Sequence, residues 1–440
     1  MTFSKHFGWM DVLDNKDVDQ SGGDDSAEAI NERLAAMHAE NPGTYGPLGG
    51  SGSEESGPSG RLVSGGGTLV IPPGNYRCGE SVFGYPGQEI IVSSGARLFA
   101  DEDFADMSVV DNFAPTSLGG FGAPSFTVSG RGTIDGNGAA PHGIRTRVAS
   151  HGKVTGLTVH NCTSHGVVLG NSQYSHLEQV QSYGNGGYGF FFGRDPDVNA
   201  SFGCDSLTTV GLLSLGNGLG GMRIEEAAGG THIGFNPSNE GTGPGVSIQP
   251  IAGLVNGQTF IGGKFEGCLY GWEVLAREGS NALPRGTAFI NCYHVLQPPG
   301  GTGTGAGANP TYRFGINEGI HTSVVGGGSS FNNAADWPGL GWPSDGPGSP
   351  TTEGGFSFAM YQQHSRLGSL HLQDVATMRG SITLPYACDE VGNLWPEDHT
   401  PTNTNFAVSA IGRDDTVLPN PDGSAAFPSG GYFGPNRPNV

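Results

Sequence analysis

The chain has 440 residues, of which 79 are glycine, and its 41 acidic and 20 basic residues give a formal charge of -21. This much glycine excludes a mainly helical protein, because an interior glycine costs about 0.5–1 kcal/mol relative to alanine in a helix. The acidic balance argues against nucleic acid as a partner, since binding to phosphates needs clustered lysine and arginine. Acidic, lysine-poor chains are typical of halophilic proteins, although a GC-rich genome also replaces lysine with arginine.

The amino-terminal region predicts a short capped helix. Residues 1–12 have no signal-peptide pattern, and no run of residues approaches the roughly 18 apolar residues of a membrane span, so we expect no export by the usual signal route and no membrane insertion. Apolar residues recur three and four apart from Ala27 to Met37, which predicts a helix capped by Asp25 or Ser26. Residues 41–60 are mostly turn formers and predict a Gly-rich surface loop.

The aspartates near the amino terminus and the six cysteines are the candidate metal ligands of the chain. The first 25 residues hold aspartates at alternating spacing, which are Asp11, Asp14, Asp17, Asp19, Asp24 and Asp25. The closing glutamate of a calcium loop is absent, so we expect solvated charges and no cofactor, with calcium as the alternative. The six cysteines form no CxxC pair, which predicts small buried side chains and neither a zinc site nor a disulfide scaffold.

A repeat dominates the middle of the chain. The pattern Gly, apolar, variable, apolar begins at Gly166, Gly189, Gly221, Gly245 and Gly271, at intervals of 23, 32, 24 and 26 residues. Strands and turns that repeat at this length without helices predict an all-β, right-handed parallel β-helix, with glycine and asparagine supplying positive φ at its corners. By alternation the inward side chains are Val167, Phe190, Met222, Val246 and Trp272, followed by Leu169, Phe192, Ile224, Ile248 and Val274.

This organisation predicts three regions. Residues 1–64 form an amino-terminal strand, a capping helix and the Gly-rich loop, residues 65–388 form the parallel β-helix, and residues 389–440 form an extended Pro/Gly-rich carboxy-terminal arm. Two Pro/Gly insertions, at 298–310 and 336–350, interrupt the repeat. Insertions on one side of a solenoid usually shape its binding face.

Several segments resemble a known family. Residues 7–9, 22–31 and 66–77 resemble the opening of pectate-lyase-like β-helix proteins, and residues 130–138 resemble a coil of polygalacturonases and phage tailspikes. The resemblance implies the fold, which serves lyases, hydrolases, epimerases and non-catalytic spikes alike. Of the polygalacturonase catalytic motifs, only Ser164–Gly166 and Arg223–Glu225 have counterparts here, and the paired aspartates are missing. That family's chemistry is therefore not expected.

The opening motif without a signal peptide is similar to that of tailspikes and other virion-surface proteins. The resemblance implies a homotrimer on the tail or capsid, assembled in the host cytoplasm, that contacts other virion proteins and binds host cell-surface polysaccharide. Whether it also depolymerises that polysaccharide, as a glycoside hydrolase or polysaccharide lyase, stays open at this point. Two alternatives remain, which are an extracellular polysaccharide lyase or glycoside hydrolase from a cell and a non-catalytic structural virion protein.

Outward positions on the coils supply candidate site residues. Hydrolysis of a glycosidic bond needs two carboxyl groups, about 6.5–9.5 Å apart in inverting enzymes. The catalytic candidates are Asp195, Glu225 and Glu226, and the substrate-binding candidates are Arg194, Arg223, Glu273, Trp337 and Trp342. The alternatives are solvated charges balanced by the arginines and, for the two tryptophans, contact between subunits of a trimer.

Two further sets of residues have simpler interpretations. Asp135 precedes a glycine, so we expect its carboxylate to accept a hydrogen bond from its own turn. Five histidines gather between residues 142 and 176. We expect these histidines to be exposed side chains in turns, and a metal or acid–base role is the alternative.

Overall fold

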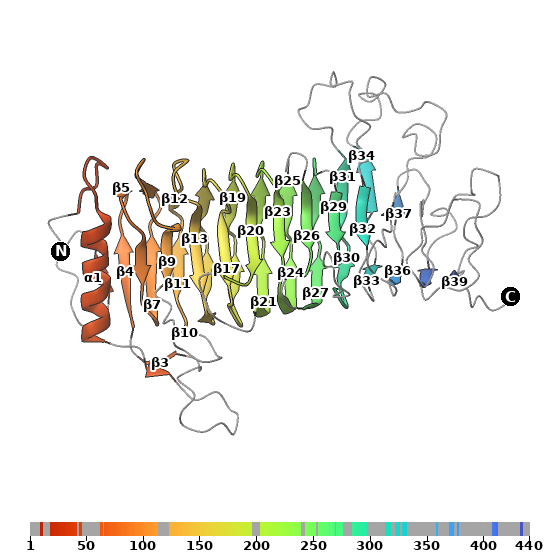
Figure 1. Ribbon diagram of the computed structural model, residues 1–440, viewed down its shortest axis with the longest axis horizontal. Helices are drawn as coiled ribbons and strands as arrows, with labels where there is room; N and C mark the ends of the chain where they lie inside the picture. Colours follow the sequence, from red (N-terminus) through yellow and green to blue (C-terminus); the bar gives the residue numbers. More distant parts are fainter. Residues whose placement is uncertain are drawn as a thin grey trace, which may run out of the picture. The chain divides into compact units, whose positions relative to one another are not determined.

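The computed structural model describes 9–11, 18–41, 44–45, 62–64, 66–112, 123–195, 203–238, 243–251, 254–268, 270–275, 284–296, 313–317, 322–325, 328–331, 358–359, 369–373, 376–377, 407–411 and 432–433. The chain divides into two compact units, Met1–Gly218 and Leu219–Val440. In each unit, strands from successive stretches of the sequence lie side by side in parallel sheets (Figure 1).

The described residues of the first unit form three parallel sheets and one helix. Its first sheet contains β1 (Trp9–Asp11), β4 (Gly67–Ile71), β7 (Gln88–Val92), β11 (Thr127–Gly130), β15 (Lys153–Thr155), β18 (His176–Glu178) and β21 (Cys204–Val210). Its second contains β5 (Gly74–Cys78), β8 (Ala96–Ala100), β12 (Thr133–Asp135), β16 (Thr158–His160), β19 (Gln181–Tyr183) and β22 (Leu213–Leu215). Its third contains β6 (Val82–Gly84), β9 (Ser108–Asn112), β13 (His142–Arg147), β17 (Val167–Gly170) and β20 (Tyr188–Gly193). Two short pairs, β2 (Thr44–Tyr45) with β3 (Leu62–Ser64) and β10 (Ala123–Pro124) with β14 (Ala149–Ser150), complete the unit.

The second unit repeats this arrangement. Its first sheet contains β24 (Ala227–Ile233), β27 (Val255–Ile261), β30 (Ala288–Ile290), β33 (Thr322–Val325), β36 (Ser369–Gln373), β38 (Ala407–Ile411) and the antiparallel β39 (Tyr432–Phe433). Its second contains β25 (Asn236–Ser238), β28 (Lys264–Glu266), β31 (Tyr293–Leu296), β34 (Gly328–Phe331) and β37 (Ala376–Thr377). Its third contains β23 (Gly220–Ile224), β26 (Pro244–Ile248), β29 (Tyr270–Val274), β32 (Arg313–Asn317) and β35 (Phe358–Ala359).

The core consists of side chains stacked from coil to coil in the predicted register. Val167 pairs with Phe190 in the first unit, and Val246 pairs with both Met222 and Trp272 in the second. All five side chains are fully buried. Burying one such side chain stabilises the folded state by about 1.5–3 kcal/mol, and each further coil adds a similar contribution. The predicted parallel β-helix is confirmed.

The glycines that open these strands are needed for a reason that the sequence analysis missed. Their φ angles are not positive, unlike those of corner glycines such as Gly156 and Gly184. A Cβ at Gly221 would lie 2.4 Å from the Gly245 carbonyl oxygen, and one at Gly166 would lie 2.0 Å from the Ser182 hydroxyl oxygen. Glycine at these strand openings therefore provides room for the next coil, whereas positive φ is required at other corners.

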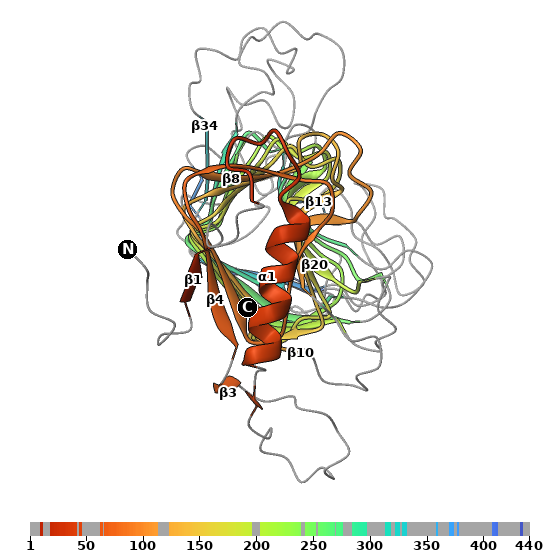
Figure 2. The ribbon, with the colours of Figure 1, turned by 90° about the vertical axis from the view of Figure 1, so that its left-hand side faces the viewer.

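The helix α1 (Ala27–Glu40) covers the amino-terminal end of the first unit, where it packs on β4, β5 and β6 (Figure 2). The Asp25 carboxylate accepts a hydrogen bond from the Ala27 amide at 3.0 Å, while Ser26 occupies the N-cap position. The Gln88 amide side chain donates to the Leu34 carbonyl at 2.7 Å, which attaches the helix to the first coils. No helix within the described ranges is long and apolar enough to span a bilayer.

The cysteines behave as small apolar side chains. The five described cysteines, Cys78, Cys162, Cys204, Cys268 and Cys292, are all free and buried, as predicted. Burial raises the pKa of the Cys162 thiol to about 12 and that of Cys292 to about 11. These thiols are therefore unreactive near neutral pH, and Cys388 lies outside the described residues.

Candidate functional site

The third sheet of each unit differs from the other two because several of its strands are buried along their whole length, although others, such as β20, keep half-buried positions. Burial alternates along β7 and β8, as expected for strands with one solvated face. Every residue of β9, β17, β23 and β26 is instead buried. Outward positions on three of these strands carry charged or polar side chains, which are Asp111 on β9, Arg223 on β23 and Ser247 on β26, whereas Val168 on β17 is apolar. The third sheet therefore buries charged and polar groups at several of its outward positions.

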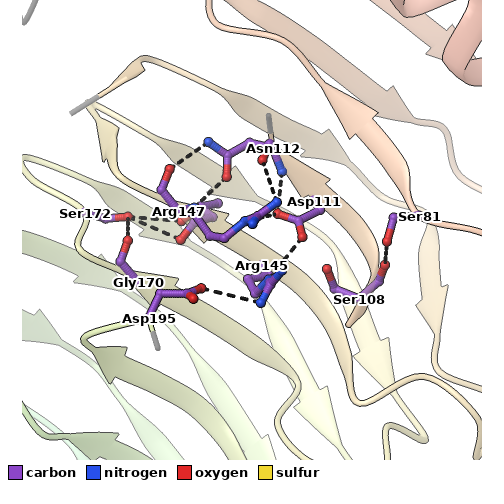
Figure 3. A network of polar contacts seen from close by, with 10 residues as sticks. Ser81, Ser108, Asp111, Asn112, Arg145, Arg147, Gly170, Ser172 and Asp195 are labelled. Atoms are coloured by element: carbon purple, nitrogen blue, oxygen red, sulfur yellow. Dashed lines mark hydrogen bonds and ion pairs between the residues drawn. The ribbon is translucent and has the colours of Figure 1, made fainter. Parts of the chain in front are cut away.

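In the first unit these outward side chains form a charge network (Figure 3). Arg145 on β13 contacts Asp111, its register partner on β9, with 3.0 Å between Nε and Oδ2. Arg147 contacts the other oxygen of Asp111, also at 3.0 Å, and Arg145 Nη1 lies 3.6 Å from Asp195 Oδ2. Two guanidinium groups thus neutralise two carboxylates that are only 1% exposed.

Neighbouring groups hold this network in place. The Asn112 side chain donates to the Arg147 carbonyl at 2.9 Å and accepts from its amide. The Asp195 amide donates to the Asn171 side-chain oxygen at 2.8 Å. A Cβ at Gly170 would lie 2.6 Å from the Asp195 Cβ, so glycine at this position allows Asp195 to approach the sheet. Asp195 is therefore held in place both by the hydrogen bond of its backbone amide and by the ion pair of its carboxylate with Arg145.

In the second unit the corresponding outward positions form a chain of hydrogen bonds. Arg223 on β23, Ser247 on β26 and Glu273 on β29 are register partners. Arg223 donates to the Ser247 hydroxyl, which donates in turn to the Glu273 carboxylate. Arg223 also reaches Gln249 Oε1 at 2.7 Å and Glu225 Oε1 at 3.2 Å. One arginine therefore links two carboxyl groups, directly to Glu225 and through Ser247 to Glu273.

Burial gives Glu273 unusual acid–base properties. The largest effect on its carboxyl is loss of contact with water, which raises its pKa, while the Ser247 hydrogen bond and the Arg223 charge oppose the rise. A carboxyl group with a raised pKa keeps its proton closer to neutral pH, which is the property of a general acid. Glu225 is more accessible, with a side chain that is 25% exposed.

The remaining predicted site residues have these positions. Arg194 and Asp195 directly follow β20 in the first unit, whereas Glu225 and Glu226 directly follow β23 in the second. Glu226 is buried, and Arg194 is half-buried. Trp337 and Trp342 lie outside the described residues.

The sequence analysis missed Asp111, Arg145, Arg147, Ser247 and Gln249. A signal for Ser247 was present, because it occupies the variable position of the glycine pattern between Arg223 and Glu273. The pattern also continues back to Gly143–Ile144–Arg145. Asp111 has no such signal, since no glycine opens β9.

Asp135 and the histidines have structural partners. The Asp135 carboxylate accepts from the Asn137 amide at 2.8 Å, as predicted for its turn, and also binds Arg97. His165 stacks on His142, with ring centroids 5.4 Å apart, and its Nδ1 accepts from the Tyr188 amide at 3.0 Å. Its ring therefore belongs to a stack between coils, unlike the exposed turn position that we expected.

No metal site is formed by the described residues, where no three or more histidine, cysteine, aspartate or glutamate side chains gather closely enough. Among the amino-terminal aspartates, Asp19 accepts hydrogen bonds from the amides of Ser21, Gly23 and Asp24. These bonds lower the pKa of its carboxyl well below the ordinary value. Asp14 and Asp17 lie outside the described residues.

No model of a protein family matches the chain, and neither does any curated protein sequence. Solved structures do match. The gp42 tailspike of Acinetobacter phage vb_AbaP_AS12 has a TM-score of 0.54 at 12% identity over 94% of this chain and 64% of its own. The tailspike of E. coli bacteriophage HK620, solved with a pentasaccharide, has a TM-score of 0.54 at 11% identity over 86% of this chain and 65% of its own.

A third match is the enzymatically active domain of tailspike protein 2 from bacteriophage CBA120, with a TM-score of 0.51 at 11% identity over 88% of this chain and 50% of its own. The chain thus spans less than two thirds of the length of each of these three structures. At this level of identity the likeness shows the fold. The protein has the parallel β-helix fold that it shares with these phage tailspikes.

Proposed function

We propose that the protein is a virion-surface protein that binds and cleaves a host cell-surface polysaccharide at the half-buried Glu225, Gln249 and Glu273 of the second unit, which lie on or beside its third sheet. The fold is shared with three phage tailspikes, one of which was solved with a pentasaccharide and another as an enzymatically active domain. In this proposal the chain acts as a homotrimer, together with other virion proteins.

The observation that carries the proposal is the polar chain in the second unit. Arg223, Ser247 and Glu273 occupy consecutive outward positions, so their backbones repeat at about 4.8 Å along the sheet. Arg223 and Ser247 are buried, so the groups that can reach a sugar hydroxyl are the half-buried carboxyl and amide side chains bonded to them. Because the groups already bond to one another, they are held in place before a ligand arrives.

The same groups suit glycosidic hydrolysis. Glu273, with its raised pKa, is the general acid that protonates the departing glycosidic oxygen. Glu225 is the second carboxylate, and it activates the attacking water. Arg223 lies between the two and holds each in position. Asp195, paired with the 6% exposed Arg145, serves as support in the first unit.

Purified lipopolysaccharides and capsular polysaccharides test this proposal. The wild-type protein is expected to bind at least one of them and to release oligosaccharides from it. The Glu273→Gln variant should keep the affinity and lose the release at least 100-fold, since a glutamine accepts the Ser247 hydrogen bond through its amide oxygen but has no acidic proton to transfer. A variant that cleaves at the wild-type rate would remove Glu273 from the mechanism.

The oligomeric state separates the alternatives. Native mass measured on the same preparation is expected to correspond to three chains of 45.3 kDa. A single chain that releases oligosaccharides would instead indicate a cellular enzyme. A trimer that binds none of the polysaccharides would indicate a structural virion protein.

A further inference from the structure

On the first sheet of the second unit, the outward side chains of β24, β27, β30 and β33 are uncharged. Its outward side chains form two columns across β24, β27, β30 and β33. The aliphatic column contains Ile233, Ile261, Ile290 and Val325, and the short column beside it contains Thr231, Thr259, Ala288 and Ser323. The inward positions between them are filled by buried residues such as Phe260 and Phe289, so both columns point away from the core.

The aliphatic column reaches solvent. Ile233 is 41% exposed, and the other three members of the column are half-buried. Branched aliphatic side chains stabilise a strand, but that role requires only one apolar face, which the core already provides. A second apolar face on the outside of a sheet indicates that something covers it.

The first sheet of the first unit is the natural comparison, because it has the same strand geometry. Its outward positions include Glu89, Lys153, His176 and Glu178, alongside Ile91 and Thr155. Charge is therefore compatible with the outer face of such a sheet. Its absence from the two columns of the second unit is a property of those coils, and Arg285 pairs with Asn256 outside the columns.

We propose that the two columns form the surface through which copies of this chain associate. The proposal names the surface for the trimeric assembly proposed above and rests on it. The charge of the chain indicates which partner covers the two columns. Because the chain has 41 acidic and 20 basic residues, copies of it repel one another except where the facing surfaces are uncharged. A basic partner would favour an acidic face, and a sugar would require more hydrogen-bonding groups than an aliphatic column offers.

Shape supports the same partner. On each strand the aliphatic side chain is larger than its neighbour in the short column, so the aliphatic column projects further from the sheet. Both columns repeat at the strand spacing of about 4.8 Å, which is identical in every copy. The aliphatic column of one copy therefore matches the spacing of the short column of another, and the contact removes apolar surface from water.

The double variant Ile261→Arg, Ile290→Arg tests the proposal by native mass. The wild-type protein is expected to associate, and the double variant should fall to the 45.3 kDa of one chain, because two buried guanidinium groups would be left without partners. The control is Ile91→Arg, at a half-buried outward position of the first unit's first sheet, which should keep the wild-type mass. Circular dichroism confirms that each variant is folded.

The milder double variant Ile261→Thr, Ile290→Thr covers the case in which arginine prevents folding. It retains branched side chains, and its oligomer should dissociate at a protein concentration at least tenfold higher than that of the wild type. A folded arginine variant with the wild-type mass, or a wild-type protein that stays monomeric, would overturn the proposal. Polysaccharide binding is measured separately. A trimer that binds no polysaccharide would contradict the proposed function but not the proposed interface.

Discussion

The Ser247 hydroxyl on β26 donates a hydrogen bond to the carboxylate of Glu273, its register partner on β29. This bond favours the ionised carboxylate, yet burial raises the pKa of Glu273 above its ordinary value of 4.5. The site therefore keeps a carboxyl group in a place where ionisation is costly. Such a cost at a group linked to a second carboxylate is typical of a catalytic site.

The stability of the protein is expected to report this cost. A carboxyl with a raised pKa in the folded state contributes stability that is fully present below its ordinary pKa and is lost as the pH rises through the raised value. Glu273→Gln removes the ionisation, so it should increase the free energy of unfolding at pH 8 relative to the wild type. Urea unfolding at pH 8 and pH 4 measures the difference, which should disappear at pH 4. A variant that is less stable at pH 8 would contradict this prediction.

Buried His232 is expected to have the opposite pH dependence. Burial lowers the pKa of its imidazole from 6.5 to about 4, although the Gln258 hydrogen bond partly opposes the shift. A depressed pKa contributes stability that is present above pH 6.5 and is lost as the pH falls through 4. Relative to His232→Phe, which continues the ring stack with Phe260, the wild type should lose roughly 3 kcal/mol over this range. If the free energies of unfolding of the two proteins changed by the same amount between pH 7 and pH 4, the imidazole would not titrate as expected.

Arg145 is expected to be the residue on which the first unit's charge network depends. Arg145→Met leaves Asp111 and Asp195 buried with less compensating charge, which should cost about 3–5 kcal/mol of unfolding free energy in urea. Adding Asp111→Asn should restore part of the loss, because one buried negative charge is then removed. If the double variant were no more stable than Arg145→Met, the ion pair would not be the source of the loss.

The two roles of glycine can be separated in the second unit. Gly221→Ala places a Cβ 2.4 Å from the Gly245 carbonyl oxygen and should disrupt the contact between coils. Gly262 has a φ of +67° and open space around its Cα, so Gly262→Ala should cost only about 1–2 kcal/mol of backbone strain. Thermal unfolding of both variants measures which substitution lowers the stability more. Equal losses would mean that room between the coils is not what requires glycine at Gly221.

Much of the fold was predictable from the sequence because a coil repeats its own geometry. Once Gly221, Gly245 and Gly271 were aligned, alternation placed Met222, Val246 and Trp272 in one stack, and the structure confirms that register. The reason for the glycines was not predictable in the same way. A lack of room depends on the neighbouring coil, whereas positive φ is a property of one residue.

The site was less predictable than the fold. Alternation correctly placed Arg223 and Glu273 on an outer face, but it also implied that they were solvated. Burial of outward side chains such as Arg223 and Ser247 depends on their neighbours in space, which the periodicity does not describe. The partners of Arg145 illustrate this point, since Asp111 precedes it by 34 residues and Asp195 follows it by 50.

Polysaccharide binding by an Arg223 variant tests the central claim most directly. The wild-type protein and Arg223→Met are compared on the same lipopolysaccharides and capsular polysaccharides, with the exposed Arg131→Met as control and Glu225→Gln as a milder change at the same face. We predict that the wild type and the control bind a common polysaccharide, and that both site variants lose at least tenfold in affinity while remaining folded. A wild-type protein that binds none of them, or folded site variants with wild-type affinity, would contradict the assignment of the third sheet's outer face as the binding site.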